Sequence, residues 1–157
     1  MRAAFEKAGF KTREKTPPPR SQTPDPPARK FVLQDNYASQ AEQVITGLKQ
    51  DRSFDYRNFT TSKIRNILAM VSEIYNDVLM EKGDTLSRDL QGRIEYMQVR
   101  LVYECGREPK IVLPFVNKAG LLELLGDIGD SRQKFIDFAR YMEALVAYHR
   151  FHGGKDN

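Results

Sequence analysis

The chain has 157 residues, of which 40% are hydrophobic and 29% are charged, and these proportions are ordinary for a globular protein. No apolar run approaches the ~18 residues that a membrane span needs, and the first residues lack the apolar core of a secretory signal. The single cysteine, Cys105, excludes an internal disulfide and suits a reducing cytoplasm.

The net charge of +4 is unevenly distributed along the chain. Residues 1–30 contain eight Lys or Arg against three Asp or Glu, a net charge of +5, whereas the remaining residues contain 17 against 18. Six of the eight prolines fall within residues 17–27. Because such a segment lacks backbone donors and apolar residues, we expect residues 1–33 to form a disordered basic tail and residues 34–157 to form one folded domain.

Helical periodicity begins after this tail. Apolar residues recur at helical spacing over residues 37–48, behind Asp35 or Asn36 as a cap. The clearest helix is "TTSKIRNILAMVSEIYNDVLMEK", residues 60–82, where apolar side chains keep one face over four turns until Gly83 ends the pattern. These two segments predict amphipathic helices that bury one face each.

The second half of the sequence is also helical. A helix is predicted over residues 85–106, with Gly106 as a left-handed cap and Pro109 beyond it. The next four residues, "KIVL", suit a brief strand or a loop, and glycines break residues 114–129 into short helices. A last helix covers residues 130–152, before Gly153–Gly154. The fold class predicted is therefore all-α, a compact bundle of about five helices.

Arginines and tyrosines form a ladder in the third of these helices. Arg93, Arg100 and Arg107 are seven residues apart, and Tyr96 and Tyr103 lie between them. At 100° per residue, this stripe lies about 120° around the helix from the apolar stripe. The ladder therefore lies outside the face that the helix buries.

Two interpretations of this ladder compete. In the first, Glu104 pairs with Arg100 and Arg107, and the tyrosines cover the edge of the core. In the second, the planar guanidinium groups bind phosphates and the rings support a nucleic-acid strand. The pattern alone does not decide between a solvated charged face and a nucleic-acid site.

A second basic feature lies at the start of the 60–82 helix. Lys63 and Arg65 occupy its first turns, where the helix macrodipole is already positive. Together with the hydroxyls of Thr60, Thr61 and Ser62 and the free backbone donors, they predict an anion pocket. A capped helix with solvated cations is the competing interpretation.

Candidates for catalysis are few. His149 and His152 are three residues apart without a second cluster of ligands, and His149 falls on the apolar stripe of its helix. Cys105 also falls on an apolar stripe, where a thiol packs and has no evident base. We therefore predict no catalytic residue, no metal site and no cofactor.

Three stretches in this order resemble a known family: "TTSKIRNILAMVSEIYN", "VRLVYECGR" and "FARYMEALVAYHRFHGG". They look like the small helical subunit of type III-A CRISPR effector complexes, the Csm complex, over roughly residues 36–154. The resemblance implies an all-helical, cytoplasmic protein without a catalytic site of its own. It implies that several copies stack along the ribonucleoprotein and contact RNA backbone, while base pairing reads the sequence.

The partners implied by this resemblance are the guide RNA (crRNA), the target RNA, the backbone and large subunits of the Csm complex, and other copies of the chain, with no membrane. The family's basic positions match Lys63, Arg65, Arg100 and Arg107, the principal RNA-binding candidates. Further candidates are Lys118, which is weaker, and three residues for RNA or a neighbouring subunit (Arg93, Arg140 and Arg150). Residues 1–33 depart from the family pattern. The alternative function is a helical adaptor that binds acidic protein partners.

Overall fold

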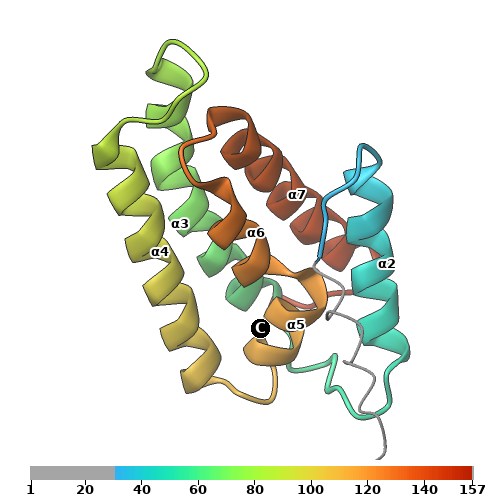
Figure 1. Cartoon of the computed structure of the whole chain (residues 1–157). Helices are drawn as coiled ribbons and strands as arrows, with labels where there is room; N and C mark the ends of the chain where they lie inside the picture. The colour runs from blue at the N-terminus through green and yellow to red at the C-terminus, as the bar shows by residue number, and fades with distance from the viewer. Residues whose placement is uncertain (1–30, 157) are drawn as a thin grey trace, which may run out of the picture.

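The computed structural model describes residues 31–156, so the expectation for residues 1–30 of the tail lies outside the described residues, whereas Phe31 and Leu33 pack against the core. The fold is all-α, as predicted (Figure 1). The helices run over the following ranges: α2 Tyr37–Gln50, α3 Thr61–Met80, α4 Arg88–Arg107, α5 Val112–Ala119, α6 Leu121–Ile128 and α7 Arg132–Phe151. No helix in this part of the chain has the length and hydropathy needed to cross a membrane.

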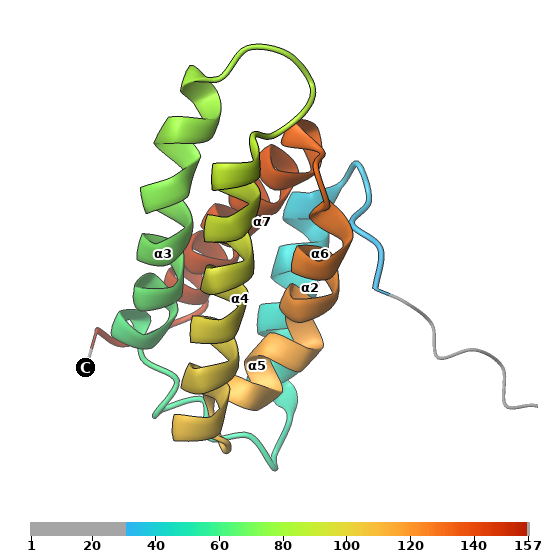
Figure 2. The same ribbon diagram turned by 60° about the vertical axis from the view of Figure 1, so that its left-hand side comes forward.

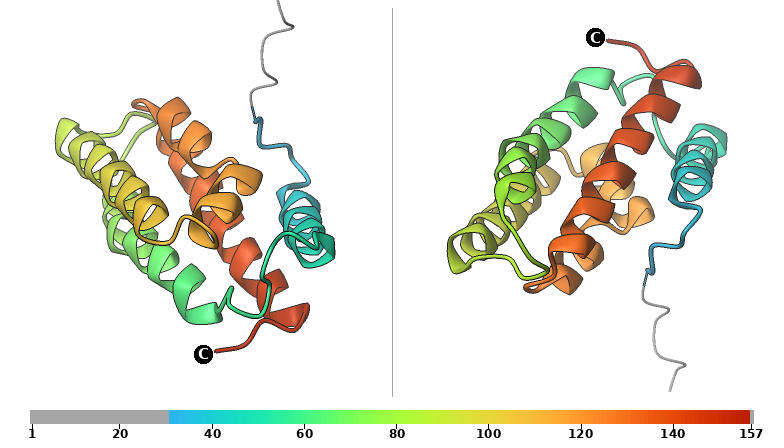
Figure 3. Two further views of the ribbon diagram at one scale, coloured as in Figure 1. Left: turned by 90° about the horizontal axis from the view of Figure 1, so that it is seen from below. Right: turned by 90° about the horizontal axis from the view of Figure 1, so that it is seen from above.

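Helix α7 is the centre of the bundle. It lies between α2 and α3, which make their most extensive contacts with it (Figure 3). Helix α4 runs antiparallel to α3 and packs on α3, α5 and α6 (Figure 2). The two short helices α5 and α6 close the core between α4 and α7. Helix α4 therefore lies at the edge of the bundle, with one side on the core.

The buried faces follow the predicted helical spacing, because residues three and four apart share one side of a helix. Every residue of the apolar stripe on α4 is buried, as are the central positions of α3 and α7. Aromatic side chains fill the middle, where the rings of Phe59 and Phe115 lie 4.8 Å apart between centroids. The hydroxyl of the buried Tyr141 donates a hydrogen bond of 2.9 Å to the carbonyl of Ala119 at the end of α5.

The ends of α4 differ from the prediction. The helix begins at Arg88, after Ser87, whose hydroxyl accepts a hydrogen bond from the Leu90 amide. Gly106 is helical and is not a left-handed cap, so that prediction was wrong. The helix ends one residue later, at Arg107, and Glu108 is its non-helical C-cap, because a residue that precedes a proline is disfavoured in the helical region.

Residues 110–128 contain no strand. Ile111 caps α5, which begins at Val112, so "KIVL" is a turn that enters a helix. Gly120 separates α5 from α6 with a φ of 67°, and the ring of Phe31 lies directly against it. An L side chain at Gly120 would be strained and would also meet that ring. The predicted short broken helices are therefore present, and their separation makes six helices within residues 31–156, where about five were expected.

Candidate nucleic-acid interface

The arginine ladder of α4 faces acidic residues of α3. Arg93 lies 2.6 Å from the Asp77 carboxylate and also donates to the carbonyl of Glu73, and its hydrogen bond to Asp77 raises its pKa. Arg100 lies 3.9 Å from the Glu73 carboxylate. Arg107 pairs with Glu104 at 3.3 Å. The predicted pairing of Glu104 is thus confirmed for Arg107 and wrong for Arg100, which pairs across to α3.

The tyrosines of the ladder do not cover the core. The exposed fraction is 65% for Tyr96 and 67% for Tyr103. Both rings lie on the side of α4 opposite its buried stripe, with Val99 between them at 64% exposed. The interpretation in which these tyrosines pack on the edge of the core is wrong.

Lys63 and Arg107 lie at one small hollow between α3 and α4. The Lys63 ammonium is 2.7 Å from the Glu108 carboxylate, and Glu104 and Glu108 line the hollow beside the two cations. The hollow therefore joins two candidate residues from different helices, but its four charges balance. The ion pairs are partly exposed, and pairs of this kind contribute only about 0–1 kcal/mol to stability.

The anion pocket predicted at the start of α3 is occupied by the chain itself. The Thr61 amide donates 2.7 Å to the carbonyl of Lys155, and the Ser62 hydroxyl donates 2.6 Å to that of Asp156. Thr61 is buried, and its hydroxyl is 3.4 Å from Nδ1 of His149. The C-terminal segment folds back and caps this helix, so no open donor cluster forms around Thr61 and Ser62.

The other candidates lie on different sides of the molecule. Arg65 follows Lys63 by two residues, which is 200° around a helix, so it points away from α4. The Lys118 side chain lies directly against Gly47 of α2. Arg150 pairs with Asp156 at 2.9 Å. The structure thus brings together Lys63, Arg93, Arg100 and Arg107, and separates them from Arg65, Lys118, Arg140 and Arg150.

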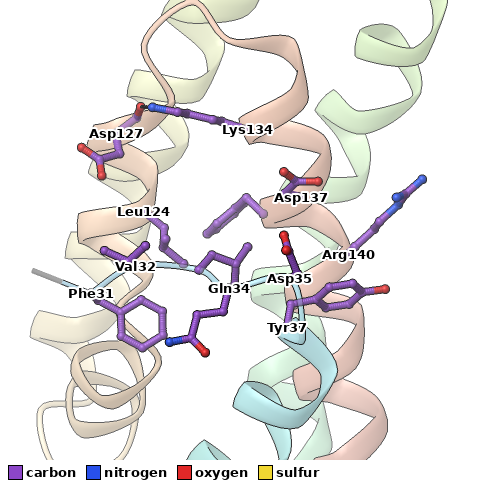
Figure 4. Close-up of a pocket in the computed structure, with 12 residues that line it drawn as sticks. Phe31, Val32, Gln34, Asp35, Tyr37, Leu124, Asp127, Lys134, Asp137 and Arg140 are labelled. Atoms are coloured by element: carbon purple, nitrogen blue, oxygen red, sulfur yellow. Dashed lines mark hydrogen bonds between the residues drawn. The ribbon is translucent and has the colours of Figure 1, made fainter.

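Arg140 belongs to a second, larger hollow of about 500 Å³ beside α6 and α7. Residues 31–37 form one wall, and Figure 4 shows the Arg140 guanidinium extending outward from the rim. Lys134 also lines it and donates to the carbonyl of Asp127. In residues 31–156, no group of three or more His, Cys, Asp or Glu side chains is arranged to hold a metal ion.

The candidate catalytic side chains all contact other parts of the fold. His149 is fully buried, with Nε2 2.6 Å from the Phe59 carbonyl, and burial lowers its pKa. His152 lies 3.1 Å from Glu42 on α2. Cys105 is buried in the α4 stripe, and burial raises the pKa of its thiol. The packing interpretation of His149 and Cys105 is confirmed.

The carboxylates that face the ladder were missed by the sequence reasoning. Asp77 pairs with Arg93, and Glu73 pairs with Arg100. Lys63, near the start of α3, pairs with Glu108, just after the end of α4, as expected for two antiparallel helices. The signal was the short connection between α3 and α4, because residues equally distant from such a turn lie opposite one another. Applied to residues 60–108, that rule places the members of each of the three pairs opposite one another to within about one helical turn.

Comparison with known proteins identifies the family. The family model described as Csm2 Type III-A matches residues 38–155. Proteins named "CRISPR system Cms protein Csm2" from Mycobacterium tuberculosis and Streptococcus thermophilus are each 42% identical over 126 residues, which cover 80% of this chain and 98% of each relative. One from Enterococcus italicus is 36% identical over 99 residues, 62% of this chain and 70% of that protein. The chain therefore belongs to the Csm2 family, the small subunits of the type III-A Csm complex.

Proposed function

We propose that this subunit is non-catalytic and binds RNA, stacking in several copies along the duplex of guide and target RNA and contacting its phosphate backbone without reading sequence. Membership of the Csm2 family supports this assignment. The engagement of His149 and Cys105 in packing supports the absence of a catalytic role. The partners proposed are both RNAs, the backbone and large subunits, and further copies of the chain.

The observation that carries the RNA-binding proposal is the α3–α4 cationic face, defined as Lys63, Arg93, Arg100 and Arg107. The three arginines lie along one side of α4, and Arg93 and Arg107 are about 21 Å apart along its axis, since each residue rises about 1.5 Å. Such a row is long enough to contact several phosphates of one strand. Arginine also suits this contact, because its planar donors fit phosphate oxygens in pairs.

The carboxylates that face these cations do not prevent RNA binding. Each pair is at least partly exposed, and replacing such a carboxylate by a phosphate costs little, because pairs of this kind are worth about 0–1 kcal/mol. The carboxylates do limit the strength of RNA binding. In one copy their negative charges balance the positive charges of the α3–α4 cationic face, so a single copy binds weakly and affinity comes from several copies on one strand.

The remaining candidates are proposed as additional contacts outside this face. Arg65 and Arg140 have no carboxylate partner within residues 31–156, so their charges are available to a ligand. Lys118 and Arg150 lie near Asp51 and Asp156, respectively. Because these four residues point to other sides of the molecule, we assign them to RNA or subunits that approach from those sides.

The test is the salt dependence of RNA binding. We expect the double variant Lys63→Gln/Arg100→Gln to fold normally, to bind a fluorescent RNA duplex more weakly in anisotropy titrations, and to lose about 0.7–1 unit of the log–log salt slope for each contact removed. Lys82→Gln/Arg88→Gln, which removes two exposed cations from the other end of α3 and α4, is the control. Equal affinity and slope in the two double variants would remove Lys63 and Arg100 from the site.

A further inference from the structure

One exposed surface is not used by the proposed phosphate contacts. The α4 outer face consists of Tyr96, Val99, Val102 and Tyr103, all more than half exposed. Helix α4 lies at the left-hand edge of the bundle in Figure 1 and at its front in Figure 2, and its partners α3, α5 and α6 lie on its other sides. Contiguous exposed apolar groups of this kind commonly mark a binding surface.

The tyrosines of this face are each matched with an arginine. Arg100 follows Tyr96 by four residues and Arg107 follows Tyr103 by four, so each pair lies on adjacent turns of the same side. The two Tyr–Arg units repeat after seven residues, about 10.5 Å along the axis. Each unit therefore presents one bare aromatic ring beside one cation.

The backbone on either side of these units is unobstructed. Gly92 and Gly106 lie inside α4 on the same side as the tyrosines, and a side chain at either position would meet nothing within 4 Å. Glycine inside a helix is otherwise unfavourable. The two glycines leave the approach to Tyr96 and Tyr103 open from both ends of the helix.

We propose that the two Tyr–Arg units bind unpaired nucleotides of RNA, with each ring stacking on a base and each guanidinium contacting a phosphate. A nucleotide combines a flat aromatic face with an anion, and this is the combination that each unit complements. Stacking of bases on aromatic side chains tolerates any sequence, because every base has a π-face. The inference rests on the proposed RNA binding and adds single-stranded segments to the duplex as ligand.

The arginines can reach such a phosphate. The Arg100 pair with Glu73 is 3.9 Å long, the Arg107 pair with Glu104 is 3.3 Å, and both guanidinium groups are about half exposed. Pairs this exposed exchange readily for another anion. An acidic protein would satisfy the arginines equally well, but its carboxylate side chains do not join the anion to a flat aromatic face as each nucleotide does.

The experiment compares Tyr96→Leu/Tyr103→Leu with Tyr96→Phe/Tyr103→Phe in the full chain. Leucine keeps an apolar side chain and removes the ring, whereas phenylalanine keeps the ring. The three probes are a single-stranded RNA 12-mer, an abasic ribose-phosphate chain of equal length and an RNA duplex. We expect the leucine variant to lose about fivefold or more in affinity per ring for the single strand only, and the phenylalanine variant to bind as the unmodified protein does.

A second readout is the intrinsic fluorescence. The chain has no tryptophan and seven tyrosines, so tyrosine emission dominates. We expect single-stranded RNA to quench it in the unmodified protein and to quench it less in the leucine variant. Because Tyr96 and Tyr103 are exposed, both variants should unfold at the same temperature as the unmodified protein.

The outcomes separate this inference from the proposed function. If the leucine variant binds the single strand normally while Lys63→Gln/Arg100→Gln binds RNA weakly, the Tyr–Arg inference is wrong and the phosphate contacts stand. If the unmodified protein binds none of the three probes, the proposed function is wrong as well. If the leucine variant keeps RNA affinity but fails to assemble with other subunits, the α4 outer face binds protein and the inference is wrong.

Discussion

Gly154 lies directly against the imidazole of His149, so that a methyl group at position 154 would overlap the ring. The Gly154 amide also donates 2.8 Å to the His149 carbonyl. The same imidazole contacts the Phe59 carbonyl and the Thr61 hydroxyl. One buried side chain thus connects the end of α7, the loop before α3 and the C-terminal segment.

The first prediction concerns this contact. Gly154→Ala should lower the free energy of unfolding by roughly 1–3 kcal/mol, because the added methyl group must displace a buried ring that already has fixed partners. Gly106→Ala is the matched control, since position 106 is helical and open, and alanine there should stabilise by about 0.5–1 kcal/mol. Chemical denaturation of both variants measures the difference. Equal effects of the two substitutions would contradict the packing described at Gly154.

The second prediction is a pH dependence of stability. The pKa of His149 is lowered below its ordinary value of 6.5 by burial. Just below pH 6.5, the unfolded chain therefore binds a proton that the folded protein does not, so stability is complete above that pH and falls on acidification, by at most about 1.4 kcal/mol per pH unit. Thermal unfolding between about pH 7.5 and 5.5 measures this slope.

The variant His149→Gln is the comparison for that slope. It should be less stable at every pH, because a buried histidine with two polar contacts is lost, but its melting temperature should fall less between those pH values. A slope equal to that of the unmodified protein would show that another group is responsible.

The third prediction tests the hydrogen bond that joins α7 to α5. Tyr141→Phe removes the donor to the Ala119 carbonyl and leaves that acceptor buried without it, which should cost about 1–3 kcal/mol. Tyr103→Phe provides the control, because the Tyr103 hydroxyl is on the exposed side of α4. Denaturation midpoints that agree within error for the two variants would refute the role given to the Tyr141 hydroxyl.

The fourth prediction concerns the carboxylate that competes with RNA. Glu108→Gln frees the Lys63 ammonium from its 2.7 Å partner and should increase RNA affinity by about 1.5- to 5-fold, the range that corresponds to a partly exposed ion pair. Stability should change by less than about 1 kcal/mol. Glu143→Gln, on the exposed side of α7, controls for the change in net charge. Anisotropy at about 0.1 M salt measures both, and unchanged affinity in Glu108→Gln would place Lys63 outside the site.

Much of the fold was predictable because the apolar residues of α3, α4 and α7 repeat at helical spacing over four or more turns. Helix ends were less predictable. Gly106 has the residue type of a cap, yet the chain remains helical there, and the restriction imposed by Pro109 on Glu108 decides the end instead.

The candidate surface was only partly predictable. Sequence spacing located the ladder on one side of α4, but it could not show that α3 places Glu73 and Asp77 opposite it. The prediction of an anion pocket at the start of α3 was wrong for a different reason. Its donors at Thr61 and Ser62 are satisfied by a segment more than ninety residues away in the chain, and no local pattern records such a contact.

The central position of α7 has a consequence for synthesis. Among the helices of residues 31–156, α2 and α3 are translated first, and they bury their apolar sides mainly against α7, which follows them by some fifty residues or more. Until the ribosome has synthesised residues 132–151, these early helices expose apolar surface that is prone to aggregation. A nascent chain stalled before that point is therefore the species that chaperones should capture.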